Sequence, residues 1–314
     1  MIEVRELVKN YGSKRVLDHI SFDVNEGEIL GLLGLNGAGK STTMNIMTGN
    51  LSSTEGTVRL NGHEILEEPL QAKKELGYLP ETPPLYPEMT VKEYLKFVYR
   101  LKKCRLPYEK HIQAVCKAAY ITEVYDRVIK NLSKGYRQRI GIAQALIGEP
   151  KILILDEPTS GLDPEQMIEI RNLIQNLRKK HTLIFSSHIL SEVQAVCDRV
   201  VVIKQGKILA DDTPEHLEEQ LAGKQLRVCA AGPEKEIGQA LRQIPGVREV
   251  SRIPCQEKGS CAFEIKVEDE IDARRRIAAY MKQSPWLLTE LTGIHLSLED
   301  IFLKLTGKKG GEKL

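Results

Sequence analysis

Residues 34–42 read Gly-Leu-Asn-Gly-Ala-Gly-Lys-Ser-Thr, and this short run constrains the chain more than any other segment. Its first glycine, four intervening residues, then Gly39, Lys40 and Ser41 match the P-loop pattern. A triphosphate needs inward-pointing backbone N–H donors and a nearby cation, and glycines let the backbone approach phosphate without a Cβ clash. We therefore expect Lys40 to reach the β- and γ-phosphates and the Ser41 hydroxyl to bind Mg²⁺.

The segments on either side of this loop fit the same interpretation. Residues 28–33, Glu-Ile-Leu-Gly-Leu-Leu, form a short apolar run that is typical of a buried strand. Residues 40–48 suit a helix that ends before Gly49. The loop would then lie between a strand and a helix, where the positive end of the helix dipole faces phosphate. The loop residues predicted to contact the nucleotide are Gly34, Asn36, Gly37, Ala38, Gly39, Lys40, Ser41 and Thr42.

A second candidate element lies at residues 151–158, Lys-Ile-Leu-Ile-Leu-Asp-Glu-Pro. Four branched apolar residues followed by two acids predict a buried strand that ends at a site. Asp156 is well placed to hold a phosphate-bound Mg²⁺, and Glu157 to orient or deprotonate an attacking water. The alternative is that both acids only cap the following turn, which a P-loop in the same chain makes much less favourable.

Residues 132–139, Leu-Ser-Lys-Gly-Tyr-Arg-Gln-Arg, resemble the signature motif of ABC ATPases. Ser133 and Gly135 match that motif, whereas Lys134 and Tyr136 stand where glycine and glutamine are usual. Such departures are similar to those of the type-2 ABC exporter branch. The resemblance implies that Ser133 and Gly135 bind the γ-phosphate of a nucleotide held by the opposite subunit. The alternative is an ordinary helix capped by serine.

Three further residues match the family in order along the chain. Tyr11 resembles the aromatic residue that stacks on adenine. Asp163 ends a Ser-Gly-Leu-Asp run that resembles the D-loop, and Asp163-Pro also reads as a helix N-cap followed by proline. His188 matches the switch histidine, so the resemblance implies a sensor of the γ-phosphate. The motifs together cover residues 4 to about 212.

One position departs from the family. The resemblance implies a glutamine after the strand near residue 80, but the run is Gly-Tyr-Leu-Pro-Glu, and Glu81 occupies that place. We expect Glu81 to approach Mg²⁺ and the attacking water, as a catalytic and metal-binding residue. The alternative is a solvated acid at the start of a proline-rich loop.

The chain of 314 residues allows about two domains. We expect an α/β P-loop ABC ATPase domain over residues 1–222, with a helical subdomain over about 84–148, helical by periodicity at 90–103 and 108–148. A small C-terminal α+β domain over 223–306 is predicted to be ferredoxin-like, because its elements read β-α-β-β-α-β. The Gly/Lys-rich tail, residues 307–314, is predicted to be disordered.

Composition and sequence pattern argue against several classes of protein. Lys and Arg number 45 against 43 Asp and Glu, for a net charge of +2, which argues against a dedicated nucleic-acid surface. No apolar run approaches the ~20 residues that span a bilayer, and the N-terminus lacks the apolar core of a signal peptide. We therefore expect a cytoplasmic chain. None of the six cysteines has CxxC spacing, which favours reduced thiols over a zinc site.

The resemblance implies the ATP-binding and ATP-hydrolysing subunit of a type-2 ABC exporter, with ATP and Mg²⁺ as cofactors. Its implied partners are a second copy or a related ATPase subunit, arranged head to tail, and an integral-membrane permease. The chain itself would be peripheral on the inner face of the cell membrane. One alternative is a soluble, non-transport ABC ATPase that acts on ribosomes or nucleic acid. Another is a nucleotide switch that scarcely hydrolyses ATP, against which Glu157 and His188 argue.

Overall fold

The computed structural model describes residues 1–187, 189–217, 225–255, 257 and 259–293. The chain divides into two compact units, Met1–Pro214 and Glu215–Leu314. The domain boundary expected after residue 222 falls in the segment 218–224, outside the described residues, as does the tail 307–314.

A six-stranded sheet forms the centre of the first unit. Five strands pair in parallel and β10 pairs antiparallel with β9 at one edge. All residues of β3, β7 and β8 are buried, which explains their uninterrupted apolar runs, because a parallel sheet is covered on both faces. The strand order is β10 (Lys207–Asp212), β9 (Arg199–Lys204), β3 (Ile29–Leu33), β8 (Thr182–Ser187), β7 (Ile152–Leu155) and β6 (Leu76–Leu79).

A four-stranded antiparallel sheet packs beside it. Its order is β2 (Lys14–Val24), β1 (Ile2–Tyr11), β4 (Glu55–Leu60) and β5 (His63–Glu64). The two sheets share one apolar cluster with helix α1 (Lys40–Met47), since Val4, Leu30 and Met44 belong to the same buried group. The strand expected at 28–33 and the helix expected at 40–48 are therefore confirmed as β3 and α1.

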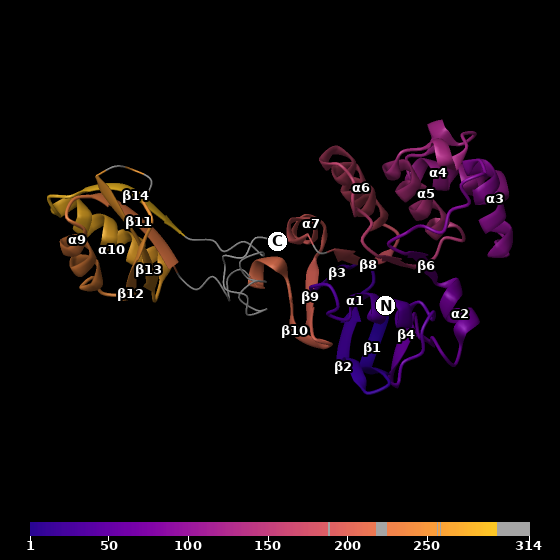
Figure 1. Ribbon diagram of the computed structural model, residues 1–314, viewed down its shortest axis with the longest axis horizontal. Helices are drawn as coiled ribbons and strands as arrows, with labels where there is room; N and C mark the ends of the chain where they lie inside the picture. The colour runs from indigo at the N-terminus through magenta and orange to yellow at the C-terminus, as the bar shows by residue number, and fades with distance from the viewer. Residues whose placement is uncertain (188, 218–224, 256, 258, 294–314) are drawn as a thin grey trace. The chain divides into compact units, whose positions relative to one another are not determined.

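Helices cover the other face of the six-stranded sheet. Figure 1 shows α3 to α6 on one side of this sheet and α1 with the antiparallel sheet on the other. The remaining helices of the unit are α2 (Pro69–Lys74), α3 (Val91–Leu101), α4 (Tyr108–Ala118), η1 (Thr122–Val124), η2 (Ile129–Asn131), α5 (Lys134–Leu146), α6 (Pro164–Leu177) and α7 (Leu190–Val196). No helix in the described part of the chain is long and apolar enough to cross a membrane.

The expectation of helix throughout residues 108–148 was wrong. Helix α4 ends at Ala118, and Tyr120 takes a left-handed conformation with φ 53°, which cannot continue a helix. Helix α5 begins only after Ser133, whose hydroxyl accepts a hydrogen bond from the Tyr136 N–H. Because of this break, α5 has an N-terminus of its own and is not the continuation of a long helix.

Between residues 225 and 293, the described part of the second unit is a four-stranded antiparallel sheet with two helices. Its elements follow the order β11 (Gln225–Ala231), α9 (Glu234–Arg242), β12 (Val247–Ile253), β13 (Ser260–Val267), α10 (Glu270–Gln283) and β14 (Leu287–Gly293). The strands are ordered β12-β13-β11-β14. Side chains from one face of β11 and β13, such as Val228 and Phe263, pack with Ile237 of α9 and Ile277 of α10.

Candidate nucleotide site

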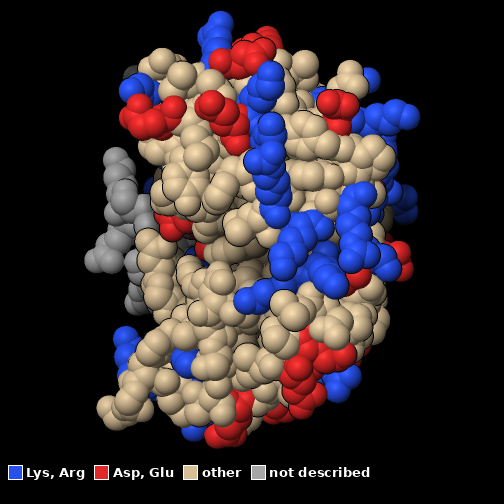
Figure 2. Space-filling view, turned by 90° about the vertical axis from the view of Figure 1, so that its right-hand side faces the viewer, with Lys and Arg blue, Asp and Glu red and all other residues tan. Residues whose placement is uncertain are grey.

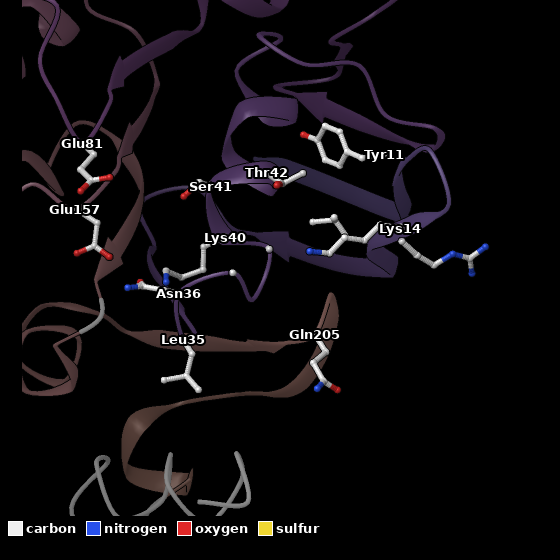
Figure 3. A pocket seen from close by; sticks show the side chains of 14 residues that line it. Tyr11, Lys14, Leu35, Asn36, Lys40, Ser41, Thr42, Glu81, Glu157 and Gln205 are labelled. Atoms are coloured by element: carbon white, nitrogen blue, oxygen red, sulfur yellow. The ribbon is translucent and has the colours of Figure 1, made fainter. Parts of the chain in front are cut away.

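A cavity of about 560 Å³ opens over the P-loop. Figure 3 shows Lys40 and Ser41 at its centre, Glu81 and Glu157 at one end, and Tyr11 and Lys14 at the other. The lining residues are Tyr11, Lys14, Arg15, Val16, Leu35, Asn36, Gly37, Gly39, Lys40, Ser41, Thr42, Glu81, Glu157 and Gln205.

The glycines of the loop have different structural roles. Gly39 has φ +118°, and a Cβ there would lie 2.6 Å from a methyl of Leu17, so glycine is required. A Cβ on Gly34 would lie 2.5 Å from the carbonyl oxygen of Ile203. Gly34 and Ala38 do not line the cavity. Ala38 instead accepts a hydrogen bond of 2.9 Å from the N–H of Gly206, which ties the loop to the turn between β9 and β10.

Lys40 is a buried cation held within the loop. Its side chain reaches back so that Nζ donates to the Gly34 carbonyl at 2.6 Å. Burial lowers the pKa of Lys40, and the nearby carboxylates of Glu157, Asp156 and Glu81 oppose that shift. The ammonium group is thus held where phosphate oxygens would meet it.

Ser186, on the adjacent strand β8, joins the two acids after β7. Its hydroxyl donates to Asp156 Oδ1 at 2.6 Å and accepts from the Glu157 N–H at 2.8 Å. Burial raises the pKa of Asp156, as do the neighbouring charges of Glu157 and Glu81, whereas the Ser186 hydrogen bond lowers it. A cation bound beside Asp156 would relieve this crowding of negative charge.

The backbone at Glu157 is strained. Its φ of 47° is left-handed, which costs a non-glycine residue roughly 1–3 kcal/mol and is concentrated at functional sites. The hydrogen bond to Ser186 holds this conformation, and the Glu157 side chain lines the cavity.

Glu81 is exposed, yet it lines the same cavity, on the side of Glu157 and Ser41 (Figure 3). Among the described residues, no three His, Cys, Asp or Glu side chains converge into a metal site. Mg²⁺ fits such a donor set, because it usually takes one or two carboxylates and completes its shell with water and substrate phosphate. Ser41, Asp156 and Glu81 offer the hard oxygen ligands that Mg²⁺ prefers.

The opposite end of the cavity is aromatic and basic. Tyr11 is half exposed at the end of β1, with Lys9 Nζ 5.4 Å from its ring centroid. Lys14 and Arg15 follow at the start of β2 and were missed from the sequence, as were Val16, Leu35 and Gln205. The Gly-Ser turn after Tyr11 could have indicated the two basic residues, because it brings the chain back toward the P-loop.

The remaining predicted residues form a separate group. Ser133 caps α5, and Asp163 caps α6 by accepting from the Gln166 N–H at 2.9 Å. A Cβ on Gly135 would lie 2.6 Å from the Gln166 side chain, so the starts of α5 and α6 are adjacent. None of these residues lines the cavity. His188 lies outside the described residues.

Comparisons with known proteins agree with this geometry. Residues 17–160 match the family model described as ABC transporter. The "Uncharacterized ABC transporter ATP-binding protein YxlF" of Bacillus subtilis (strain 168) is 34% identical over 310 residues, covering 97% of this chain and 99% of the relative. The "Bacitracin transport ATP-binding protein BcrA" of Bacillus licheniformis is 35% identical over 222 residues, covering 70% and 72%. A solved structure of an ATP-binding subunit of an ABC transporter superposes with TM-score 0.63 at 30% identity, covering 70% of this chain and 92% of that one.

Proposed function

Because the chain belongs to the family of ABC transporter ATP-binding proteins, we propose that its ATP hydrolysis drives a separate membrane permease of the type-2 exporter branch. The chain is an ATPase of this family. The observation that carries the proposal is the single cavity that joins a P-loop lysine, two carboxylates and an aromatic side chain. The Bacillus licheniformis relative is named for bacitracin transport, which supports a role in transport.

We assign the following roles to residues that line the cavity and to Asp156, which lies beside it. Backbone N–H groups of the loop and Lys40 bind the phosphates, and Tyr11 stacks on the adenine. Ser41, Asp156 and Glu81 would hold Mg²⁺, which neutralises phosphate charge when it is bound. Glu157 accepts the proton of the water that attacks the γ-phosphate, giving ADP and inorganic phosphate.

Ser133, Gly135 and Asp163 lie outside the cavity, and we propose that they serve the nucleotide of an opposing subunit in a head-to-tail dimer. Helix α5 has no acid in its first turn and begins with Lys134. Such a helix start favours an anion, because its N–H groups and dipole are positive. His188 would sense the γ-phosphate of the subunit's own nucleotide.

The helical part of the first unit offers a surface for the permease. Figure 2 shows Lys and Arg side chains gathered in a band on one face of the molecule, with Asp and Glu above and below. Helix α3 carries exposed Lys92, Lys96 and Arg100 at four-residue spacing. Exposed Phe97 lies edge-on against exposed Tyr86, with ring centroids 5.4 Å apart. Exposed aromatic rings among charges are typical of a protein interface.

We further propose that the second unit has the ferredoxin-like fold, since its β-α-β-β-α-β order and its strand order β14-β11-β13-β12 fit that arrangement. It would act as an accessory or regulatory domain. In this proposal the chain is cytoplasmic and peripheral on the inner face of the membrane, and it does not bind nucleic acid.

Size-exclusion chromatography with light scattering tests the dimer. Glu157→Gln should bind Mg·ATP without hydrolysing it and run with the mass of two 35.4 kDa chains. The control variant Glu157→Gln with Lys40→Ala should stay monomeric. A Glu157→Gln protein that binds Mg·ATP yet stays monomeric would contradict the head-to-tail assembly.

Purification of the tagged chain from detergent-solubilised membranes tests the permease. A multi-spanning protein should co-purify in stoichiometric amount with the wild type. Phe97→Asp should lose that protein while its ATP affinity stays the same, because Phe97 is exposed and outside the nucleotide cavity. Equal recovery with both proteins would refute the proposed surface.

A further inference from the structure

A second cavity, of about 650 Å³, lies between α4, the C-terminal ends of α5 and α6, and the residues that lead into β8. Its lining shares no residue with the nucleotide cavity. Val115, Leu146 and Leu177 line it with apolar groups that are almost wholly buried. Exposed Ala118 lies at its edge and leaves it open.

A buried histidine in the lining of this cavity has a ring nitrogen that none of the described residues pairs. The His111 side chain is only 3% exposed, and its Nε2 accepts the Gly148 N–H at 3.1 Å. The ring proton of the neutral imidazole is therefore on Nδ1. Among the described residues Nδ1 has no hydrogen-bond partner, since Glu149 Oε1 is 3.8 Å away. Buried donors are almost always paired, so this unpaired ring N–H sets His111 apart in the cavity lining.

The mouth of the cavity is basic. Lys117, Lys179 and Lys180 are exposed and line it, against one lining acid, Glu149. His181, also in the lining, donates from Nδ1 to the Pro150 carbonyl at 2.7 Å when the imidazole is neutral. Burial lowers the pKa of His181, as does Lys180, while the hydrogen bond to Pro150 and the charge of Glu149 oppose the shift. Three cations around an apolar floor attract a negative charge.

We propose that this cavity binds a small organic anion with an apolar body. The body would pack on Leu146 and Leu177 beside the His111 ring, and the acidic group would lie among the lysines. Ligand cavities typically combine such an apolar lining with a few fixed polar groups. This site is additional to the nucleotide site and does not depend on the proposed coupling to a permease.

Fluorescence titration of the full-length chain with 8-anilinonaphthalene-1-sulfonate tests the site, because this probe is an apolar aromatic anion. Saturable binding is expected in the wild type and in Lys40→Ala, which leaves this cavity intact. Ala118→Phe should abolish it by filling the cavity from its exposed edge. Lys117→Ala with Lys180→Ala should weaken it about 2- to 30-fold, the range that two exposed ion pairs supply.

Matched controls separate this site from general adsorption. Lys96→Ala with Lys110→Ala removes two exposed lysines outside the cavity and should leave the affinity unchanged. N-phenyl-1-naphthylamine, which lacks the sulfonate, should bind the wild type and both lysine variants equally. Equal affinity of the sulfonate for both lysine double variants, or full binding by Ala118→Phe, would overturn the proposal.

Nuclear magnetic resonance of the histidine side chains gives a second readout. The sulfonate should shift the ¹⁵N resonance of His111 Nδ1, assigned by its loss in His111→Asn. The resonance of exposed His19, which contacts Asp18 at 2.9 Å, should stay in place. An unmoved His111 signal at saturating probe would place the probe elsewhere and overturn the assignment.

Discussion

The buried Ser186 hydroxyl connects the two acids of the nucleotide site. Removing it should lower the free energy of unfolding and the fraction of Asp156 that is ionised. Ser186→Ala takes a hydrogen bond from a carboxylate, worth about 1.5–3 kcal/mol. It also leaves the buried Glu157 N–H without its acceptor, which costs about 1–3 kcal/mol. We therefore expect the free energy of unfolding of the first unit to fall by about 3–5 kcal/mol near pH 8.

This cost should depend on pH. The pKa of Asp156 in the folded chain lies above its ordinary value of 3.8, so ionisation of Asp156 costs stability as the pH rises through that folded pKa. The Ser186 hydrogen bond holds that pKa down, and its loss raises the pKa further. The Ser186→Ala penalty should therefore be smaller in acid, where Asp156 is protonated, and about 1–1.5 kcal/mol larger at high pH, the difference between a hydrogen bond to a charged group and one to a neutral group.

Urea denaturation from pH 4 to pH 8 measures these values. The single tryptophan, Trp286, is partly buried and packs against the core of the second unit, so its fluorescence should report an unchanged transition. Circular dichroism also reports the unfolding transition of the first unit. Asp156→Asn provides the matched background, in which the Ser186→Ala penalty should lose its pH dependence. A penalty below 1 kcal/mol, or the same pH dependence in both backgrounds, would refute this reasoning.

Three other changes test separate parts of the account. Lys40→Ala should weaken ATP binding about 10- to 150-fold, because a charged hydrogen bond contributes ~1.5–3 kcal/mol, and calorimetric affinity within threefold of wild type would contradict it. Ending the chain after residue 222, just beyond the first unit, should leave a folded protein that binds ATP; a folded but non-binding fragment would contradict the domain division. Glu81→Gln should keep ATPase activity but need more Mg²⁺ for its half-maximal rate, since Mg²⁺ favours carboxylate over amide oxygen, and superimposable Mg²⁺ titrations would place Glu81 away from the metal.

The sequence predicted those parts of the fold that local chemistry specifies. The P-loop could be located because consecutive residues specify a strand, glycines suited to positive φ and the start of a helix. The β-α-β-β-α-β order expected for the C-terminal part is present in the described residues of the second unit, since short amphipathic elements with clear turns carry strong periodicity. The break between α4 and α5 could not be predicted, because nothing in the residue type of Tyr120 requires a left-handed backbone.

The residues of the nucleotide site could be predicted only where they belong to a sequence motif. Gln205 reaches the cavity through the turn between β9 and β10, and that approach depends on strand order in a sheet that the sequence does not specify. The role of Ser186 was missed for the same reason, because its two hydrogen bonds cross from β8 to the end of β7. Contacts between neighbouring parallel strands leave no short-range pattern in the residues.

Release of inorganic phosphate from Mg·ATP tests the central claim most directly. Glu157 lines the cavity in a strained backbone conformation, and we assign it the proton of the attacking water. The purified wild type should turn over ATP. Glu157→Gln should bind ATP with similar affinity and lose about 10²- to 10⁴-fold in rate, the usual contribution of a positioned general base. Turnover by Glu157→Gln at the wild-type rate would contradict this assignment of the catalytic site.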